Sequence, residues 1–206
     1  MFKKYWKFFV IFWSVVLVGI IGVFVFFWLI SAGKLGFMPT FEELENPNNR
    51  FASEVYFADG PIMNRYFEKE NRKYIEYREI PQSVIDALIA TEDVRFYDHS
   101  GVDVRGLFRV AKGLLTANTS AGGGSTISQQ LAKMLFPRES DLNVFELAIR
   151  KFREWVIAVR LEKSYTKEEI LTMYLNKYDF LNLAVGISSA ADIYFQVPLD
   201  SLKVEQ

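Results

Sequence analysis

The stretch ATEDVRFYDHSG, from Ala90 to Gly101, is the most informative part of this sequence. It follows a segment in which apolar residues have the spacing of a buried helix, and Ser83–Asp86 is typical of a capping pattern for that helix. Glu92 therefore lies at the end of an apolar helix. We expect it to be partly buried there, and this burial would raise the pKa of its carboxyl group.

Outward from this stretch toward the C-terminus, apolar periodicity predicts more helices, separated by breaks that are rich in Gly or contain Pro. The predicted helices cover Val104–Leu115, Thr126–Leu135, Asn143–Leu161 and Lys167–Asn176. The last is preceded by Thr166, which forms a capping-box pattern with Glu169. The sequence therefore predicts a mainly α domain.

Toward the N-terminus the pattern becomes typical of β-structure. Ser53–Phe57 and Ile62–Tyr66 flank Ala58–Gly60, and the Asp-Gly pair within it is a strong hairpin signal. We expect a small β-hairpin at the start of the domain, joined by Lys73–Tyr77 as a further strand.

The N-terminal segment Phe8–Ile30 is apolar except for Ser14 and exceeds the roughly 20 residues needed to span a bilayer. It is too long for the apolar region of a cleaved signal peptide, the alternative that we considered. Lysines precede it, which favours a cytoplasmic N-terminus and an exported remainder. The predicted organisation is a tail (1–7), a transmembrane helix (8–30), a linker (31–50) and one domain (51–206).

Composition limits the class of function. A chain of 206 residues has room for about one domain after the anchor, so one active site is expected. The absence of cysteine excludes disulfides and thiolate metal sites. Acidic residues outnumber basic ones outside the N-terminal lysines, so nucleic acid is not an expected partner.

Four stretches resemble, in order, the signature motifs of glycosyltransferase family 51, the peptidoglycan polymerases of class A penicillin-binding proteins. These motifs are E-D-x-x-F-x-x-H-x-G, G-S-T-I-x-Q-Q-L-x-K, R-K-x-x-E and K-x-x-I-L-x-x-Y-L-N. The matching stretches are Ala90–Gly101, Gly124–Lys133, Arg150–Glu154 and Lys167–Asn176. Four motifs in one order are far more specific than any single one.

The resemblance implies a lysozyme-like helical lobe outside the plasma membrane. It implies transfer of a growing glycan chain from undecaprenyl pyrophosphate to the 4-hydroxyl of lipid II, with inversion. Membrane lipid and a cell wall synthesis complex are the implied surroundings. The chain departs from the family at Met134, usually Asn, and at Gln196, usually Gly in Y-F-G. Ser201–Gln206 resembles the start of a helix that family members continue, so we expect the domain to be incomplete at its C-terminus, and in bifunctional members a transpeptidase domain would follow.

By resemblance, Glu92 is the general base, and Glu154 is a second catalytic carboxylate that assists the leaving group directly or through a divalent cation, Mg or Mn. No cofactor is required by the sequence, and no ligand set at metal spacing surrounds His99, which we interpret as structural. The residues expected to bind substrate are Ser125, Thr126, Gln129, Gln130, Lys133, Arg150, Lys151 and Asn176. Those expected to support the site without touching substrate are Asp93, Phe96 and His99.

Two local features strengthen the expectation of a diphosphate site. The run Gly122–Thr126 opens a predicted helix, whose free backbone amides could receive a phosphate. Arg150, Lys151 and Arg153 place cations near Glu154 on one predicted helix, and arginine suits bidentate phosphate contact.

Three alternatives stay open. A lysozyme-like lobe with two carboxylates could hydrolyse glycosidic bonds, although a hydrolase does not need the cations. Ser164–Lys167 spells the S-x-x-K of penicillin-sensitive acyl transferases, without the companion motifs of that class. The third alternative is a protein that binds lipid II, or scaffolds other cell wall proteins, without catalysis.

Overall fold

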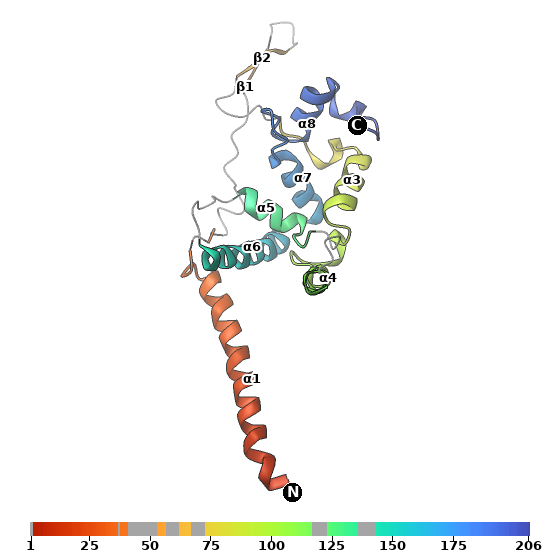
Figure 1. The fold of residues 1–206 in the computed structure, drawn as a ribbon. Helices are drawn as coiled ribbons and strands as arrows, with labels where there is room; N and C mark the ends of the chain where they lie inside the picture. The colour runs from red at the N-terminus through yellow and green to blue at the C-terminus, as the bar shows by residue number, and fades with distance from the viewer. Residues whose placement is uncertain are drawn as a thin grey trace.

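The computed structural model describes residues 2–36, 38–40, 53–56, 62–66, 73–116, 123–135 and 143–206. The described part is mainly helical, as predicted, with a long N-terminal helix that extends away from a lobe of shorter helices (Figure 1). The α-helices are α1 (Phe2–Ser31), α3 (Gln82–Glu92), α4 (Val104–Leu115), α5 (Ile127–Leu135), α6 (Val144–Ser164), α7 (Lys167–Lys177) and α8 (Ile187–Ala190). Short 3-10 helices cover Tyr77–Glu79, Phe96–Asp98 and Leu199–Ser201, and a π-helical turn covers Ala191–Phe195.

Helix α1 is the one helix of the described residues that is long and apolar enough to cross a membrane, over Tyr5–Ser31. Most of its apolar side chains are exposed, whereas Ile30 in its last turn is fully buried. The helix begins at Phe2, so the predicted tail is helical over most of its length. The C-terminal end of α1 is therefore part of the lobe. The rest of the helix presents an apolar surface that suits lipid.

Two short strands precede the lobe. Strand β1 (Ser53–Tyr56) pairs antiparallel with β2 (Ile62–Tyr66), with a register shift between Val55 and Tyr56. The predicted turn at Ala58–Gly60 lies outside the described residues.

The further strand predicted at Lys73–Tyr77 is wrong, because residues 73–76 have no regular structure and a 3-10 helix begins at Tyr77. The side chain of Asn176 explains how the backbone of this segment is paired. Its Oδ1 accepts from the N–H of Ile75 at 3.0 Å, and its Nδ2 donates to the carbonyl of Ile75 at 2.8 Å. An amide side chain thus satisfies the backbone groups that a neighbouring strand would otherwise pair.

The core of the lobe lies where α5 packs against α6 and α7. Phe96, Ile127, Leu131, Leu161 and Ile170 are fully buried in it. Five such side chains contribute roughly 1.5–3 kcal/mol each relative to their exposed state, which gives the lobe a hydrophobic basis for stability.

The residues that cap the N-termini of the helices were predicted only in part. Thr166 caps α7 with Glu169 in the predicted capping box, and Asn143 caps α6 in the same way. The capping pattern at Ser83 is wrong, because the N-cap of α3 is Pro81 and makes no side-chain cap bond. Proline already fixes its own φ near the helical value and has no N–H to satisfy, which explains a start at this position.

The last described residues include Gln196, which departs from the family, and the segment where a helix start was expected. Gln196 follows the π-helical turn with φ of 55°, and its N–H donates to the carbonyl of Asp192. The family's usual glycine would hold this left-handed conformation without strain. The helix start expected over Ser201–Gln206 does not form, since the 3-10 helix ends at Ser201.

Candidate active site

Glu92 is the last residue of α3, and its side chain is held from two other helices. Nε2 of Gln130, on α5, donates to Oε2 of Glu92 at 2.7 Å, and the hydroxyl of Tyr174, on α7, donates to Oε1 of Gln130 at 2.9 Å. Glu92 is exposed, so the expected partial burial is wrong. The carboxylate is oriented by a hydrogen-bond chain while it stays open to an incoming group.

Tyr174 gives this chain its direction. Burial raises the pKa of the Tyr174 hydroxyl, and the nearby Glu92 carboxylate raises it further, so the group keeps its proton and acts as a donor. A donor at this position requires the oxygen of the Gln130 amide, which turns the amide nitrogen toward Glu92. The sequence analysis assigned no role to Tyr174. Its partner Gln130 is 44 positions away in the sequence, so no local pattern indicates the contact.

Asp93 points away from its neighbour Glu92 and is buried. Its Oδ2 accepts from the N–H of Ile127 at 3.1 Å and lies 3.0 Å from Nε2 of His99. Because the N–H of Gly101 donates to Nδ1 of His99 at 3.3 Å, the ring proton belongs on Nε2, facing Asp93. Asp93 and His99 thus connect the end of α3 to the start of α5.

Two of the backbone amides at the start of α5 that were expected to be free are already bonded within the protein. The N–H of Ile127 is used by Asp93, and the N–H of Gln129 donates to Oγ1 of Thr126 at 3.2 Å. For these two amides the expected phosphate contact is wrong, because the protein's own groups occupy them. Gly122 lies outside the described residues.

Three residues predicted to bind substrate are buried framework residues here. Oγ1 of Thr126 donates to the carbonyl of Gly101 at 2.7 Å, and Nε2 of Gln129 donates to the same oxygen at 3.2 Å. Asn176 holds Ile75 as described above. With exposed fractions of 2%, 1% and 6%, Thr126, Gln129 and Asn176 leave almost no surface for a substrate contact.

A second polar cluster joins α6 to the start of α5. Nζ of Lys151 donates to Oε2 of Glu154 at 3.0 Å and to Oγ of Ser125 at 2.8 Å. Glu154 is 8% exposed, while the side chain of Lys151 is 41% exposed. A lysine that keeps one side open beside a buried carboxylate can receive an anion and remain in place.

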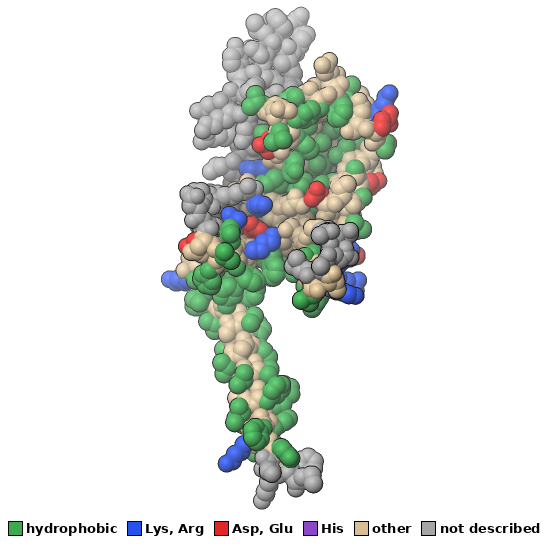
Figure 2. Space-filling model, in the orientation of Figure 1, with side chains coloured by type: hydrophobic (Ala, Val, Ile, Leu, Met, Phe, Trp, Pro, Cys, Tyr) green, Lys and Arg blue, Asp and Glu red, His purple; other side chains and the backbone are tan. Residues whose placement is uncertain are grey.

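The other predicted basic residues lie on the two helices that this cluster joins. Arg150 on α6 is half-buried and Lys133 on α5 is exposed. Figure 2 shows basic side chains gathered where α5 and α6 meet, above the upper end of α1. Arg153, by contrast, is directed at the segment after α1, where a Cβ on Gly36 would collide with its guanidinium.

The residues that the structure describes contain no group of three or more His, Cys, Asp or Glu side chains that could hold a metal ion. The divalent cation expected beside Glu154 would therefore need ligands from a substrate as well, and diphosphate oxygens are ligands that Mg²⁺ takes.

Sequence reasoning missed a half-buried ion pair behind the site. Nζ of Lys167 donates to Oε1 of Glu162 at 2.8 Å and to the carbonyl of His99 at 2.7 Å, and it lies 4.2 Å from the centre of the Phe96 ring. Ser128 also donates to Glu162. A lysine in the first turn of a helix opposes the helix dipole, and that signal could have indicated a tertiary partner.

The same contacts argue against the acyl transferase alternative. In the S-x-x-K stretch, Lys167 is engaged by Glu162 and His99, and Thr166 caps α7. The lysine is therefore not placed to activate Ser164.

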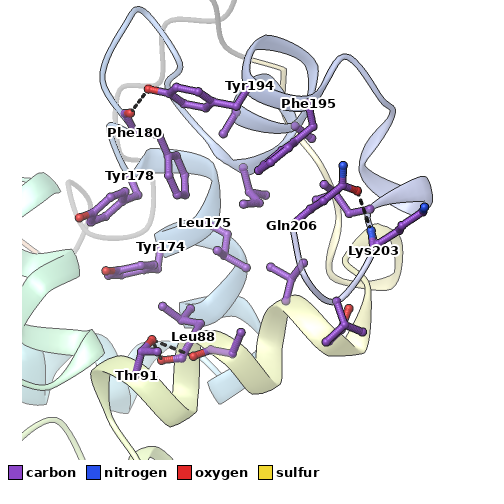
Figure 3. A pocket seen from close by; sticks show the side chains of 18 of the residues that line it. Leu88, Thr91, Tyr174, Leu175, Tyr178, Phe180, Tyr194, Phe195, Lys203 and Gln206 are labelled. Carbon is purple, nitrogen blue, oxygen red and sulfur yellow. Dashed lines mark hydrogen bonds between the residues drawn. The ribbon is translucent and has the colours of Figure 1, made fainter.

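A groove of about 660 Å³ lies beside Glu92, between α3, α7 and the segment from α8 to Gln206. Figure 3 shows its aromatic wall, formed by Tyr174, Tyr178, Phe180, Tyr194 and Phe195. The hydroxyl of Tyr194 donates to the carbonyl of Phe180 at 2.6 Å, which braces that wall. The lining is mainly apolar, so the polar chemistry belongs to the two clusters around Glu92 and Glu154.

This combination of a helical lobe, an oriented exposed carboxylate and a lysine-paired buried one agrees with the family that the motifs indicated. The transglycosylase family model matches residues 59–206, and the chain belongs to this family, glycosyltransferase family 51.

Penicillin-binding proteins 1A are among its relatives. The chain is 37% identical to that of Escherichia coli K12 over 82% of this chain and 19% of the relative. It is 37% identical to that of Pseudomonas aeruginosa over 82% of this chain and 20% of the relative. It is 36% identical to that of Haemophilus influenzae over 86% of this chain and 20% of the relative. The chain thus spans about a fifth of the length of these relatives.

Proposed function

We propose that this chain is a membrane-anchored peptidoglycan glycosyltransferase that polymerises lipid II into glycan strands in bacterial cell wall synthesis. The family match supports the class of enzyme. The observation that carries the mechanism is the exposed Glu92 carboxylate, oriented by Gln130 and Tyr174. General bases must be both accessible and held within hydrogen-bond reach of the proton that they remove.

In the proposed reaction the 4-hydroxyl of the lipid II acceptor transfers its proton to Glu92 as its oxygen attacks the anomeric carbon of the growing chain. The bond from that carbon to undecaprenyl pyrophosphate breaks, and the configuration inverts. The departing diphosphate carries the bonding electron pair away.

Charge on the leaving group requires cations. Lys151 is held beside Glu154 and Ser125 with an open side, and Arg150 and Lys133 lie on the same helices as the cluster. Electrostatic groups that are fixed before the reaction need no reorganisation as charge develops. Glu154 keeps Lys151 in place and assists departure directly or through a divalent cation, Mg or Mn.

The anchor fits substrates with lipid tails. Helix α1 would cross the plasma membrane with the lysine-bearing N-terminus in the cytoplasm, because basic residues stay on that side. The lobe would then face the outer surface, where it meets lipid II, the growing glycan and a cell wall synthesis complex.

A product assay separates synthesis from hydrolysis. The chain is supplied with labelled lipid II in one reaction and with preformed glycan strands in another. We expect long strands from lipid II, digestible by a muramidase, and no shortening of preformed strands. Shortening of the strands without growth would favour the hydrolase, and lipid II binding without either reaction would favour the non-catalytic alternative.

A further inference from the structure

The C-terminal end of α1 packs against α6 through aromatic side chains. The Phe152 ring lies 5.4 Å from the Phe26 ring and 5.7 Å from the Phe27 ring, both nearly perpendicular to it, and 5.1 Å from the ring of Trp155. Ile30, one turn further along α1, is fully buried. Perpendicular aromatic pairs of this kind add to the stability that area burial provides. The membrane helix is thus packed into the lobe.

Arg160 on α6 fastens the same joint with hydrogen bonds. Its Nη2 donates to the carbonyl of Ser31 at 2.9 Å and to Oγ of Ser31 at 2.8 Å, and its Nη1 donates to the carbonyl of Pro39 at 3.0 Å. The carbonyls at a helix C-terminus lack partners within the helix and attract cations. A single guanidinium therefore closes the end of α1 and holds the segment that follows it.

The segment after α1 has little freedom at this point. Gly36 has φ of 114°, and any Cβ there would collide with the guanidinium of Arg153. Arg153 is 9% exposed. The backbone after the membrane helix therefore folds closely over α6.

Helix α6 carries both the joint and part of the proposed active site. Successive residues of a helix are 100° apart, so Phe152 and Lys151 face different directions, and Lys151 with Glu154 faces the start of α5. Helix α6 is continuous over its 21 residues and is packed on two sides, so we expect it to move as one body. Any tilt or shift of α1 must then reach Lys151 and Glu154.

From this arrangement we infer that the α1–α6 joint positions the active site relative to the bilayer, with Phe152 and Arg160 as positioning residues. The inference rests on the proposed function, since a lipid-linked diphosphate lies at a depth that the headgroups fix. The joint holds the α6 cations at that depth. Misplacement by about 1 Å can cost roughly 10²-fold in rate, so a loose joint is expected to matter.

Spin-label distances test the joint directly, because the chain has no cysteine of its own. Ser14→Cys in α1 and Ser164→Cys at the end of α6 are both exposed sites. In nanodiscs we expect a narrow distance distribution for the doubly labelled parent. Phe152→Ala and Arg160→Gln should broaden it. The matched controls Phe145→Ala and Lys163→Gln, exposed positions on the same helix, should leave it unchanged.

Two substrates separate positioning from general damage. On lipid II in vesicles, Phe152→Ala and Arg160→Gln should lose about 10-fold or more in kcat/KM, while on a short-chain, water-soluble lipid II analogue they should stay near the parent. Equal losses on both substrates, or an unchanged distance distribution, would overturn the inference. A parent that makes no glycan from either substrate counts against the proposed function, and the distance distributions still decide whether the joint is rigid.

Discussion

The amide of Gln130 lies between the carboxylate of Glu92 and the hydroxyl of Tyr174, and its nitrogen donates to Glu92 at 2.7 Å. This contact joins residues that are 38 positions apart in the sequence. It fixes the orientation of an exposed carboxylate that would otherwise sample several rotamers. The orientation of the proposed base on α3 therefore depends on a residue of α5.

Replacing Gln130 tests this dependence. Gln130→Ala should lower kcat of lipid II polymerisation by about 10- to 100-fold, because a misplaced base costs rate even when it is present. Gln82→Ala, which removes an exposed glutamine bonded to Asp86 on α3, is the control and should match the parent. A Gln130→Ala chain that polymerises at the parent rate would show that the contact does not orient the base.

Asp93 should matter for stability as well as for the site. Asp93→Ala leaves the N–H of Ile127 and Nε2 of His99 without their acceptor. Each buried donor that loses its acceptor costs roughly 1–3 kcal/mol, so the free energy of unfolding should fall by about 3 kcal/mol. Urea unfolding in detergent measures it, with the exposed Asp98→Ala as the control. A loss no larger than that of the control would contradict the role of Asp93 in joining α3 to α5.

The pairing of Arg95 with Asp103 predicts a pH dependence. The hydrogen bond from the Arg95 guanidinium holds the pKa of Asp103 below its usual value, and the N–H of Gly106 lowers it further. A carboxyl whose pKa is lower in the folded state stabilises the fold above its unfolded pKa, near 3.9, and this stability is lost as pH falls through the folded value.

Asp103→Asn should therefore weaken the decline in unfolding midpoint as the pH falls below about 4. Thermal unfolding at a series of pH values measures that decline. Asp200→Asn, an exposed carboxyl in the last 3-10 helix, should keep the parent's pH profile. Identical profiles for the Asp103 variant and the parent would mean that the pair does not contribute.

Gln196 has the left-handed conformation that costs a side chain roughly 1–2 kcal/mol, whereas glycine brings only an entropic cost of about 0.5–1 kcal/mol. Gln196→Gly should therefore raise the free energy of unfolding by about 0.5 kcal/mol. Glu205→Gly, outside the positive-φ positions, should give no gain. A destabilised Gln196→Gly chain would show that the glutamine side chain contributes more than its strain costs.

The sequence predicts elements well where the determinants are local. Val104–Leu115 has the predicted bounds, and the Thr166 capping box forms as expected. Ser83 fails as a cap because a proline two residues earlier already begins the helix. Lys73–Tyr77 fails as a strand because its backbone partner is the distant side chain of Asn176.

The candidate site divides in the same way. Motifs locate Glu92 and Glu154, but they do not separate residues that face a substrate from residues that hold the framework. Thr126 and Gln129 both donate to the carbonyl of Gly101, a contact between the start of α5 and a distant loop that no spacing rule contains. Burial and pairing across the fold decide such roles, and only the structure provides them.

The most direct measurement is the polymerisation rate of labelled lipid II by Glu92→Gln, compared with the parent and with Glu168→Gln, an exposed glutamate on α7. Loss of a general base costs about 10²–10⁴-fold, and glutamine keeps the shape of the side chain. We predict that loss for Glu92→Gln alone, with lipid II binding retained. Polymerisation by Glu92→Gln at the parent rate would contradict the account and move the search for the base to Glu154.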